Sequence, residues 1–130
     1  MHNSSKISTT TASLAMILFA VALLFSAKAE AQVAKELPPL AGDNESRASA
    51  INGRGDVVGS SGNFAKGPVT GVHWDRKGKA TALLPLAGHA DSQALAINGK
   101  GQVAGNSGFF FGFYEPTAVV WVEGQPPRVL

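Results

Sequence analysis

Apolar residues are distributed along this chain in two different ways. Residues 14–25 are twelve consecutive apolar residues, whereas the chain after residue 31 has only short apolar runs separated by glycine, asparagine and charged residues. No segment of this second part has apolar positions at the 3.6-residue spacing of a helix over ten residues. The pattern therefore predicts an apolar N-terminal helix followed by an all-β chain.

The N-terminal segment has the layout of a secretory signal peptide. Lys6 precedes the apolar run, and alanines alternate with other residues within 27–31, as signal peptidase requires. An uncleaved membrane anchor is the alternative, but a spanning helix needs about 20 apolar residues. We therefore expect residues 1–31 to be a signal peptide, with the cleaved bond directly before Glu30 or Gln32. The expected location is secreted or periplasmic, with membrane contact only through the transient signal peptide.

The rest of the chain is one unit written twice. Residues 39–62 and 85–108 are identical at 15 of 24 positions with an offset of 46, and Trp74 and Trp121 continue the match with an offset of 47. Such internal repetition is the signature of repeat architectures. We therefore divide the mature chain into a linker at 32–38, a first β-repeat at 39–84 and a second β-repeat at 85–130.

Each copy is predicted to form two hairpins. Asn52-Gly53 and Asn98-Gly99 follow short apolar runs, and Asn-Gly supplies the positive φ angles of a tight turn. The predicted fold is two tandem four-stranded antiparallel β-repeat units, arranged like propeller blades or as a small sandwich, after the N-terminal signal helix. The expected strands are residues 48–51, 56–60, 69–75 and 80–84 in copy 1, and 94–97, 102–106, 117–122 and 127–130 in copy 2.

Small and large residues recur at matching positions of the two copies. Small residues on a strand allow another sheet or backbone to approach closely, and the large residues are the expected core between adjacent units. The small pairs are Ala48/Ala94, Ala50/Ala96 and Gly59/Gly105, and the large pairs are Ile51/Ile97, Val57/Val103 and Trp74/Trp121.

The repeated run Ala-x-Ala-Ile-Asn-x-x-Gly-x-Val-x-Gly-x-Ser, at residues 48–61 and 94–107, resembles the HAF-type repeats of exported bacterial proteins. The final stretch of that family unit, His-Ala-Phe-x-Trp, is matched at residues 70–74 and 117–121 by its small residue and its Trp, while His and Phe are replaced. The resemblance implies an extracellular repeat protein arranged like propeller blades, and it implies no defined reaction.

Candidate catalytic and metal-binding groups are few. His73 and His89 each have an acidic residue nearby, Asp75 or Asp91, and Ser92 adjoins the second pair. A catalytic triad depends on spatial geometry, and a zinc site needs three or four ligands. The sequence therefore predicts no catalytic residues, no cofactor and no metal site.

An aromatic run is the least expected feature of the chain. An exposed patch of this kind typically marks an interface or a ligand groove. The alternative is that alternate rings fill the core beside Trp121. The candidate interface or ligand patch consists of Phe109, Phe110, Phe111, Phe113 and Tyr114.

Composition narrows the function classes. The chain has no cysteine, which excludes disulfides and thiolate chemistry, and its formal net charge of +2 is too small to indicate nucleic-acid binding. We expect an exported non-enzymatic β-repeat protein that acts as a scaffold or binding module. Its expected partner is a protein or a glycan, or a second copy of the chain in a homo-oligomer. The alternatives are a carbohydrate-active or other hydrolytic propeller-type protein, and a truncated fragment of a longer repeat array.

Overall fold

The computed structural model describes residues 32–109 and 115–130, and those from residue 36 onward belong to one compact unit. The expected signal helix at residues 1–31 lies outside the described residues. Within them, no helix is long and apolar enough to cross a membrane.

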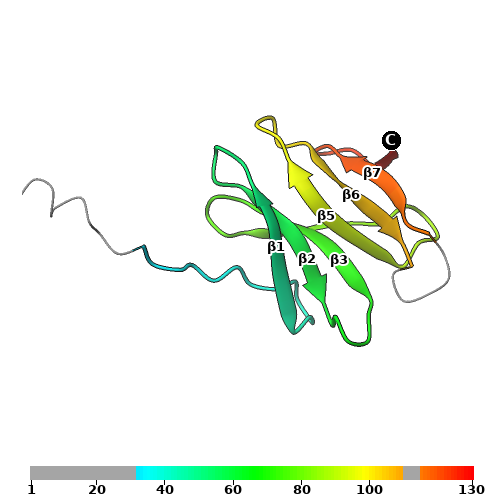
Figure 1. The fold of residues 1–130 in the computed structure, drawn as a ribbon, viewed down its shortest axis with the longest axis horizontal. Coiled ribbons are helices and arrows are strands. Elements are labelled where there is room, and N and C mark those ends of the chain that lie inside the picture. Colours follow the sequence, from blue (N-terminus) through cyan, green and yellow to red (C-terminus); the bar gives the residue numbers. More distant parts are fainter. Residues whose placement is uncertain (1–31, 110–114) are drawn as a thin grey trace, which may run out of the picture. The chain divides into compact units, whose positions relative to one another are not determined.

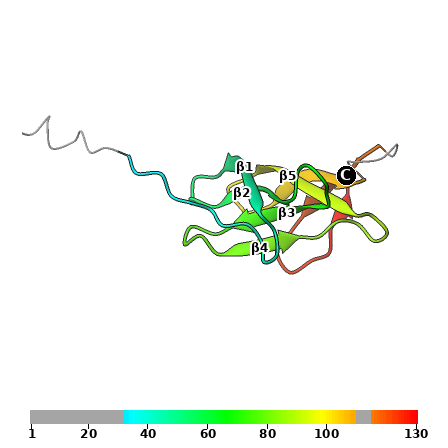
Figure 2. The same cartoon turned by 90° about the horizontal axis from the view of Figure 1, so that it is seen from below.

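The predicted all-β fold is confirmed: two antiparallel four-stranded sheets follow one another along the chain, with strand orders β1-β2-β3-β4 and β5-β6-β7-β8 (Figures 1 and 2). Each strand pairs with the next one in sequence, so each sheet is a meander of hairpins. Sheet 1 contains β1 (Glu45–Ile51), β2 (Val57–Gly62), β3 (Val69–Trp74) and β4 (Ala80–Leu83), and sheet 2 contains β5 (Asp91–Ile97), β6 (Val103–Gly108), β7 (Thr117–Trp121) and β8 (Arg128–Val129).

The first hairpin of each sheet turns on an asparagine side chain. In sheet 1, Asn52 Oδ1 accepts the backbone N–H groups of Arg54 and Asp56, each at 3.0 Å. In the first hairpin of sheet 2, Asn98 Oδ1 accepts the equivalent pair of N–H groups. The sequence placed the positive φ angles at the Asn-Gly pairs, and this detail was wrong. The left-handed residue is the second glycine, Gly55 with φ 86° and its equivalent Gly101 with φ 81°, because the asparagine side chain itself closes the start of the turn.

A β-bulge shapes the first strand of each sheet. The register of β1 shifts between Ala48 and Ala50, and β5 has the same shift between Ala94 and Ala96. A side chain at Gly59, opposite the bulge, would overlap the backbone carbonyl of Arg47, and the equivalent Gly105 has the same constraint. The repeated glycines therefore allow close approach within each sheet, as the sequence predicts for small residues.

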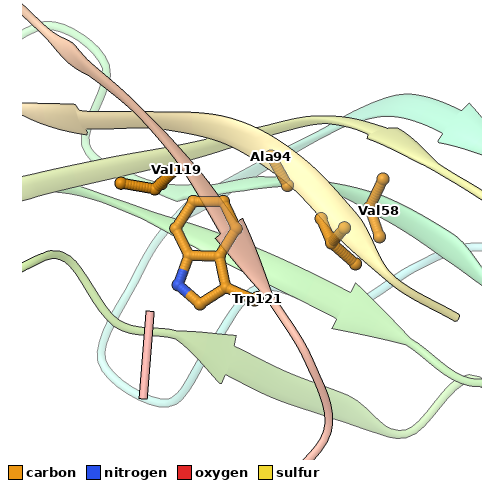
Figure 3. Packing of buried hydrophobic residues seen from close by; sticks show 5 residues of the cluster. Val58, Ala94, Val119 and Trp121 are labelled. Atoms are coloured by element: carbon orange, nitrogen blue, oxygen red, sulfur yellow. The ribbon is translucent and has the colours of Figure 1, made fainter. Parts of the chain in front are cut away.

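The core lies between the two sheets. We call the face of each sheet that contains Val58 or its equivalent Ala104 the front face, and the opposite one, which contains Trp74 or Trp121, the back face. The front face of sheet 1 packs on the back face of sheet 2, where Val58 forms one apolar cluster with Ala94, Val119 and Trp121 (Figure 3). The apolar cluster comprises Val58, Ala94, Val103, Val119 and Trp121, with Ala50, Leu83, Leu86 and Ile97 packed against it.

The expected core between adjacent units is confirmed at three of the six large positions, Ile97, Val103 and Trp121, whereas Trp74 is buried on the back face of sheet 1, outside the cluster between the sheets. Trp74, Trp121 and Val103 are buried and Ile97 packs against the cluster, while Val57 is half-buried. Ile51 is 68% exposed, so its placement in the core was wrong. It lies on the back face of sheet 1, whereas its equivalent Ile97 lies on a back face that sheet 1 covers.

The segment before each sheet is anchored in the same way. Trp74 Nε1 donates to the Pro38 carbonyl and Trp121 Nε1 to the Leu84 carbonyl, both at 2.8 Å. Ser46 Oγ similarly donates to the Leu37 carbonyl at 2.7 Å. Because these bonds hold residues 37–40 against sheet 1, the back face of that sheet is covered over Trp74 but not over Ile51.

Candidate functional site

A cleft of about 550 Å³ lies between the two copies. Copy 1 contributes the Arg54 and His73 side chains and the β4 edge with Leu84, and copy 2 contributes Trp121 and the turn around Glu123. Its walls are mainly apolar, with one cationic and one acidic side chain, so it is suited to binding a small ligand or a peptide segment.

Arg54 reaches this cleft from the first asparagine turn. Its Nε atom lies 3.4 Å from Asp56 Oδ2, and its guanidinium lies over Gly101 of the second turn, where a side chain would collide with Nη2. Asp56 Oδ2 also accepts the Asn52 amide at 3.1 Å. Since the Arg54 side chain is 56% exposed, its ion pair with Asp56 adds little stability, and the guanidinium can meet a ligand.

His73 lies deeper in the cleft wall. Its Nε2 atom is 3.7 Å from Asp56 Oδ1 and has no hydrogen-bond partner. The sequence grouped His73 with Asp75, but the Asp75 carboxylate accepts the N–H groups of Lys77 and Lys79 in the β3–β4 turn, each at 2.9 Å. The backbone hydrogen bond from Lys79 is the main reason why the pKa of Asp75 is lowered. The acid next to His73 in the fold is therefore Asp56.

His89 has a structural environment of its own. Its Nδ1 atom lies 2.9 Å from Ser107 Oγ, and its ring packs at 5.7 Å, tilted by 56°, against Phe109. Ser107 Oγ also accepts the Leu86 N–H at 2.8 Å. The equivalent position in copy 1 is Asp43, whose carboxylate accepts the Ser61 hydroxyl at 2.6 Å. The histidine thus occupies a position that fixes the start of each sheet.

Asp91 and Ser92 join the two sheets. Asp91 Oδ1 accepts the Val69 N–H at 2.7 Å, and Ser92 Oγ accepts the Gly71 N–H at 2.8 Å while it donates to the Leu83 carbonyl at 2.5 Å. Both residues are buried. The structure therefore gives the serine and the aspartate of this candidate group backbone partners on sheet 1, and it gives His89 a different serine.

The candidate aromatic patch is described at one residue. Phe109 is half-buried beside His89, while Phe110, Phe111, Phe113 and Tyr114 lie outside the described residues. For metals, the part of the chain that the structure describes has no group of three or more acidic or histidine side chains that would hold an ion.

The cleft itself was missed by the sequence analysis, because it forms only where the two copies stack. Its Trp121 was expected in the core, and Arg54 directly follows the Asn52-Gly53 pair that was predicted as a tight turn. The available signal was their repetition, since a turn and a Trp that recur in register must lie close to their equivalents when the units pack. Comparisons of the chain with protein-family models, with curated proteins and with solved structures returned no match.

Proposed function

We propose that the chain is an exported, non-enzymatic β-repeat protein that serves as a scaffold or binding module. The observation that carries the proposal is that most of the candidate catalytic side chains are hydrogen-bonded to backbone groups of the fold. Asp91 and Ser92 bond the backbone of the neighbouring sheet, and Asp75 closes a turn. Groups that are committed to backbone partners stabilise the fold and are poorly placed to exchange protons with a substrate.

Two further features support export. The apolar run and alternate alanines of the N-terminal segment are typical of a secreted chain. The repeated unit resembles the repeats of exported bacterial proteins, and the lack of cysteine means that its sheets are stabilised by packing and hydrogen bonds without disulfides.

The cleft between the copies is the surface we assign to a partner. It combines apolar walls with the half-exposed Arg54 guanidinium and the unpartnered His73 Nε2. A protein segment or a glycan is the kind of partner such walls accommodate, since apolar area supplies affinity and a few polar groups supply orientation.

Expression of the full chain in a bacterium, followed by fractionation, tests this function. We expect the protein in the periplasm or medium, with its N-terminus at Glu30 or Gln32 by mass spectrometry. Chromogenic glycoside, ester and peptide substrates should show no turnover that differs between the wild type and the His73→Asn and His89→Asn variants. A hydrolase activity that either substitution abolishes would overturn the proposal, and so would a chain that stays uncleaved in the cytoplasm.

A further inference from the structure

The contact between the two sheets is a template for a further contact. The front face of sheet 1 receives β5 so closely that a Cβ at Gly71 would lie 3.3 Å from the Ala94 nitrogen. Side-chain hydrogen bonds cross the contact: Ser92 Oγ accepts the Gly71 N–H and donates to the Leu83 carbonyl, Asp91 accepts the Val69 N–H, and Asn52 Nδ2 donates to the Asn98 carbonyl at 3.1 Å. The contact is therefore defined by particular positions of the repeat.

The front face of sheet 2 has the same positions but is not covered by any strand in residues 32–109 and 115–130. Ala118 is equivalent to Gly71 and is exposed, as is Ala96. Ala104 and Val120 on the same face are half-buried. Besides these small apolar side chains, the face contains Gln93, Asn106 and Arg128, which are equivalent to Arg47, Ser60 and Thr81 on the face of sheet 1 that receives β5.

The back face of sheet 1 has the complementary half of the template. Ala48 is equivalent to the fully buried Ala94 but is exposed, and Ile51 next to it is 68% exposed. Ser46 Oγ donates to the Leu37 carbonyl as Ser92 Oγ does to that of Leu83. The strand β1 is therefore already arranged in the way that β5 is arranged when it docks.

We propose that a second copy of this chain docks head-to-tail on the first. The back face of sheet 1 of the arriving copy lies on the front face of sheet 2 of the first copy. Ser46 of the arriving copy would accept the Ala118 N–H, and the Asn98 amide would donate to the arriving Asn52 carbonyl. The two faces that meet are different and complementary, so the contact is heterologous. Repetition of such a contact generates a ring if the rotation from one copy to the next closes. The assembly deepens the proposed scaffold function and rests on it.

Sequence differences make this contact weaker than the internal one. Ala118 adds a methyl group where Gly71 leaves space, so the sheets must separate by a few tenths of an ångström. Pro116 stands where Val69 supplies an N–H to Asp91, and a proline has none to donate. Leu37 and Leu130 are both equivalent to Leu83, so one of them must move aside where two chains meet. We therefore expect reversible association that depends on concentration.

Light scattering of the purified full chain, as the cell processes it, tests the proposal over a series of concentrations. The wild type should show a mass that rises with concentration to a multiple of the processed chain. Ala118→Arg and Ala48→Arg each place a charge on one of the two faces, and each should weaken self-association at least tenfold. Ala65→Arg, in an exposed loop outside both faces, is the matched control and should associate like the wild type.

Mixing the two face variants distinguishes head-to-tail docking from a symmetric dimer. Each keeps one intact face, so an equimolar mixture should form a one-to-one heterodimer although each protein alone is a monomer. Ala118→Gly should lower the dissociation constant several-fold, and this variant carries no risk that a buried charge unfolds the sheet. A wild-type monomer at every concentration would overturn the proposal, and so would a mixture of face variants that stays monomeric. The masses measured by light scattering report on self-association alone. Failure of the proposed function would instead appear in the fractionation and in the substrate assays, so the two proposals can fail independently.

Discussion

The first strands of the two sheets have the same local structure but different surroundings. Ala94 on β5 is fully buried under sheet 1, while Ala48 at the same position of β1 is exposed. The bulge, the glycine opposite it, the asparagine turn and the tryptophan hydrogen bond are nevertheless present in both sheets. Burial by a neighbouring sheet is therefore not needed to form the strand, since the repeated residues form it in either environment.

Some of the positions that differ between the copies have different surroundings. Ser61 and Ser107 are equivalent serines, but Asp43 accepts the hydroxyl of the first and the His89 ring lies beside the hydroxyl of the second. Gly71 is covered by β5, and its equivalent Ala118 is exposed. The comparison separates residues that fold a sheet from residues that determine what the sheet meets, and substitutions on either side of that division should have different effects.

The largest effect is expected from Gly105→Ala. The new methyl group would overlap the Gln93 carbonyl in the neighbouring strand, and backbone cannot yield as a flexible side chain does. Overpacking typically costs about 1–3 kcal/mol and occasionally more, so we expect a loss of about 3 kcal/mol in the free energy of unfolding. Gly59→Ala should cost a similar amount, because its methyl group would overlap the Arg47 carbonyl. Urea denaturation followed by circular dichroism measures both.

Gly53→Ala is the matched control for these two substitutions. Gly53 is in the first asparagine turn and does not have a positive φ, and a methyl group added there would have no neighbouring atom within 4 Å. Its replacement should change the free energy of unfolding by less than about 0.5 kcal/mol. If Gly59→Ala were as mild as Gly53→Ala, the bulge would not require glycine, and the repeated glycines would need another explanation.

The eight strands follow from local patterns in the sequence. Short apolar runs bounded by turn residues, among them the two Asn-Gly pairs, predicted all of them, with ends that differ from the structure by up to three residues, as at β1, which begins at Glu45 instead of residue 48. The strands extend further because their ends are paired in register with a neighbour, Glu45 with Gly62 and Asp91 with Gly108. Polar residues at these ends gave no apolar signal to predict that pairing.

The next largest effect is expected at the serine that the two copies share. Ser92 is fully buried and bridges the Gly71 N–H and the Leu83 carbonyl, so Ser92→Ala would remove the partner of a buried N–H and of a half-buried carbonyl. Such groups cost about 1–3 kcal/mol, and we expect a loss of about 2 kcal/mol. Ser46→Ala should cost about 0.5–1 kcal/mol, because Ser46 is half-buried and water can replace its bond to the Leu37 carbonyl. Urea denaturation measures both losses.

Measuring both serine variants in the Ala118→Arg background keeps self-association out of the comparison. Equal losses for Ser46→Ala and Ser92→Ala in that monomeric background would contradict the distinction between the two strands. A larger loss for Ser46→Ala in the associating protein than in the monomeric background is the result expected if this serine also accepts the Ala118 N–H of another copy.

The candidate site depended on information that the sequence does not contain. His73 and Asp56 are seventeen residues apart and meet because β2 and β3 pair Val58 with His73, which brings the turn before β2 to that end of β3. Nearness along the chain suggested Asp75 instead. Likewise, the bond from Val69 to Asp91 requires one sheet to lie on another, and no local pattern in either strand records which face is covered.

The smallest effect is expected in the β3–β4 turn, where the two copies have different residues. Asp75 has no acidic equivalent in copy 2, since Val122 stands at that position. Because its pKa is lowered in the folded chain, mainly by the backbone hydrogen bond from Lys79, the ionised carboxylate stabilises the fold at neutral pH. This contribution is present above the ordinary pKa of an aspartate and is lost as the pH falls through the lower pKa of the folded state. We therefore expect Asp75→Asn to lower the urea midpoint slightly at pH 7, and the difference from the wild type to disappear at low pH. The Asn Oδ1 atom can still accept both N–H groups, as Asn52 Oδ1 does in the first turn, which keeps the effect small. A difference that grows on acidification would show that the Asp75 carboxylate does not stabilise this turn.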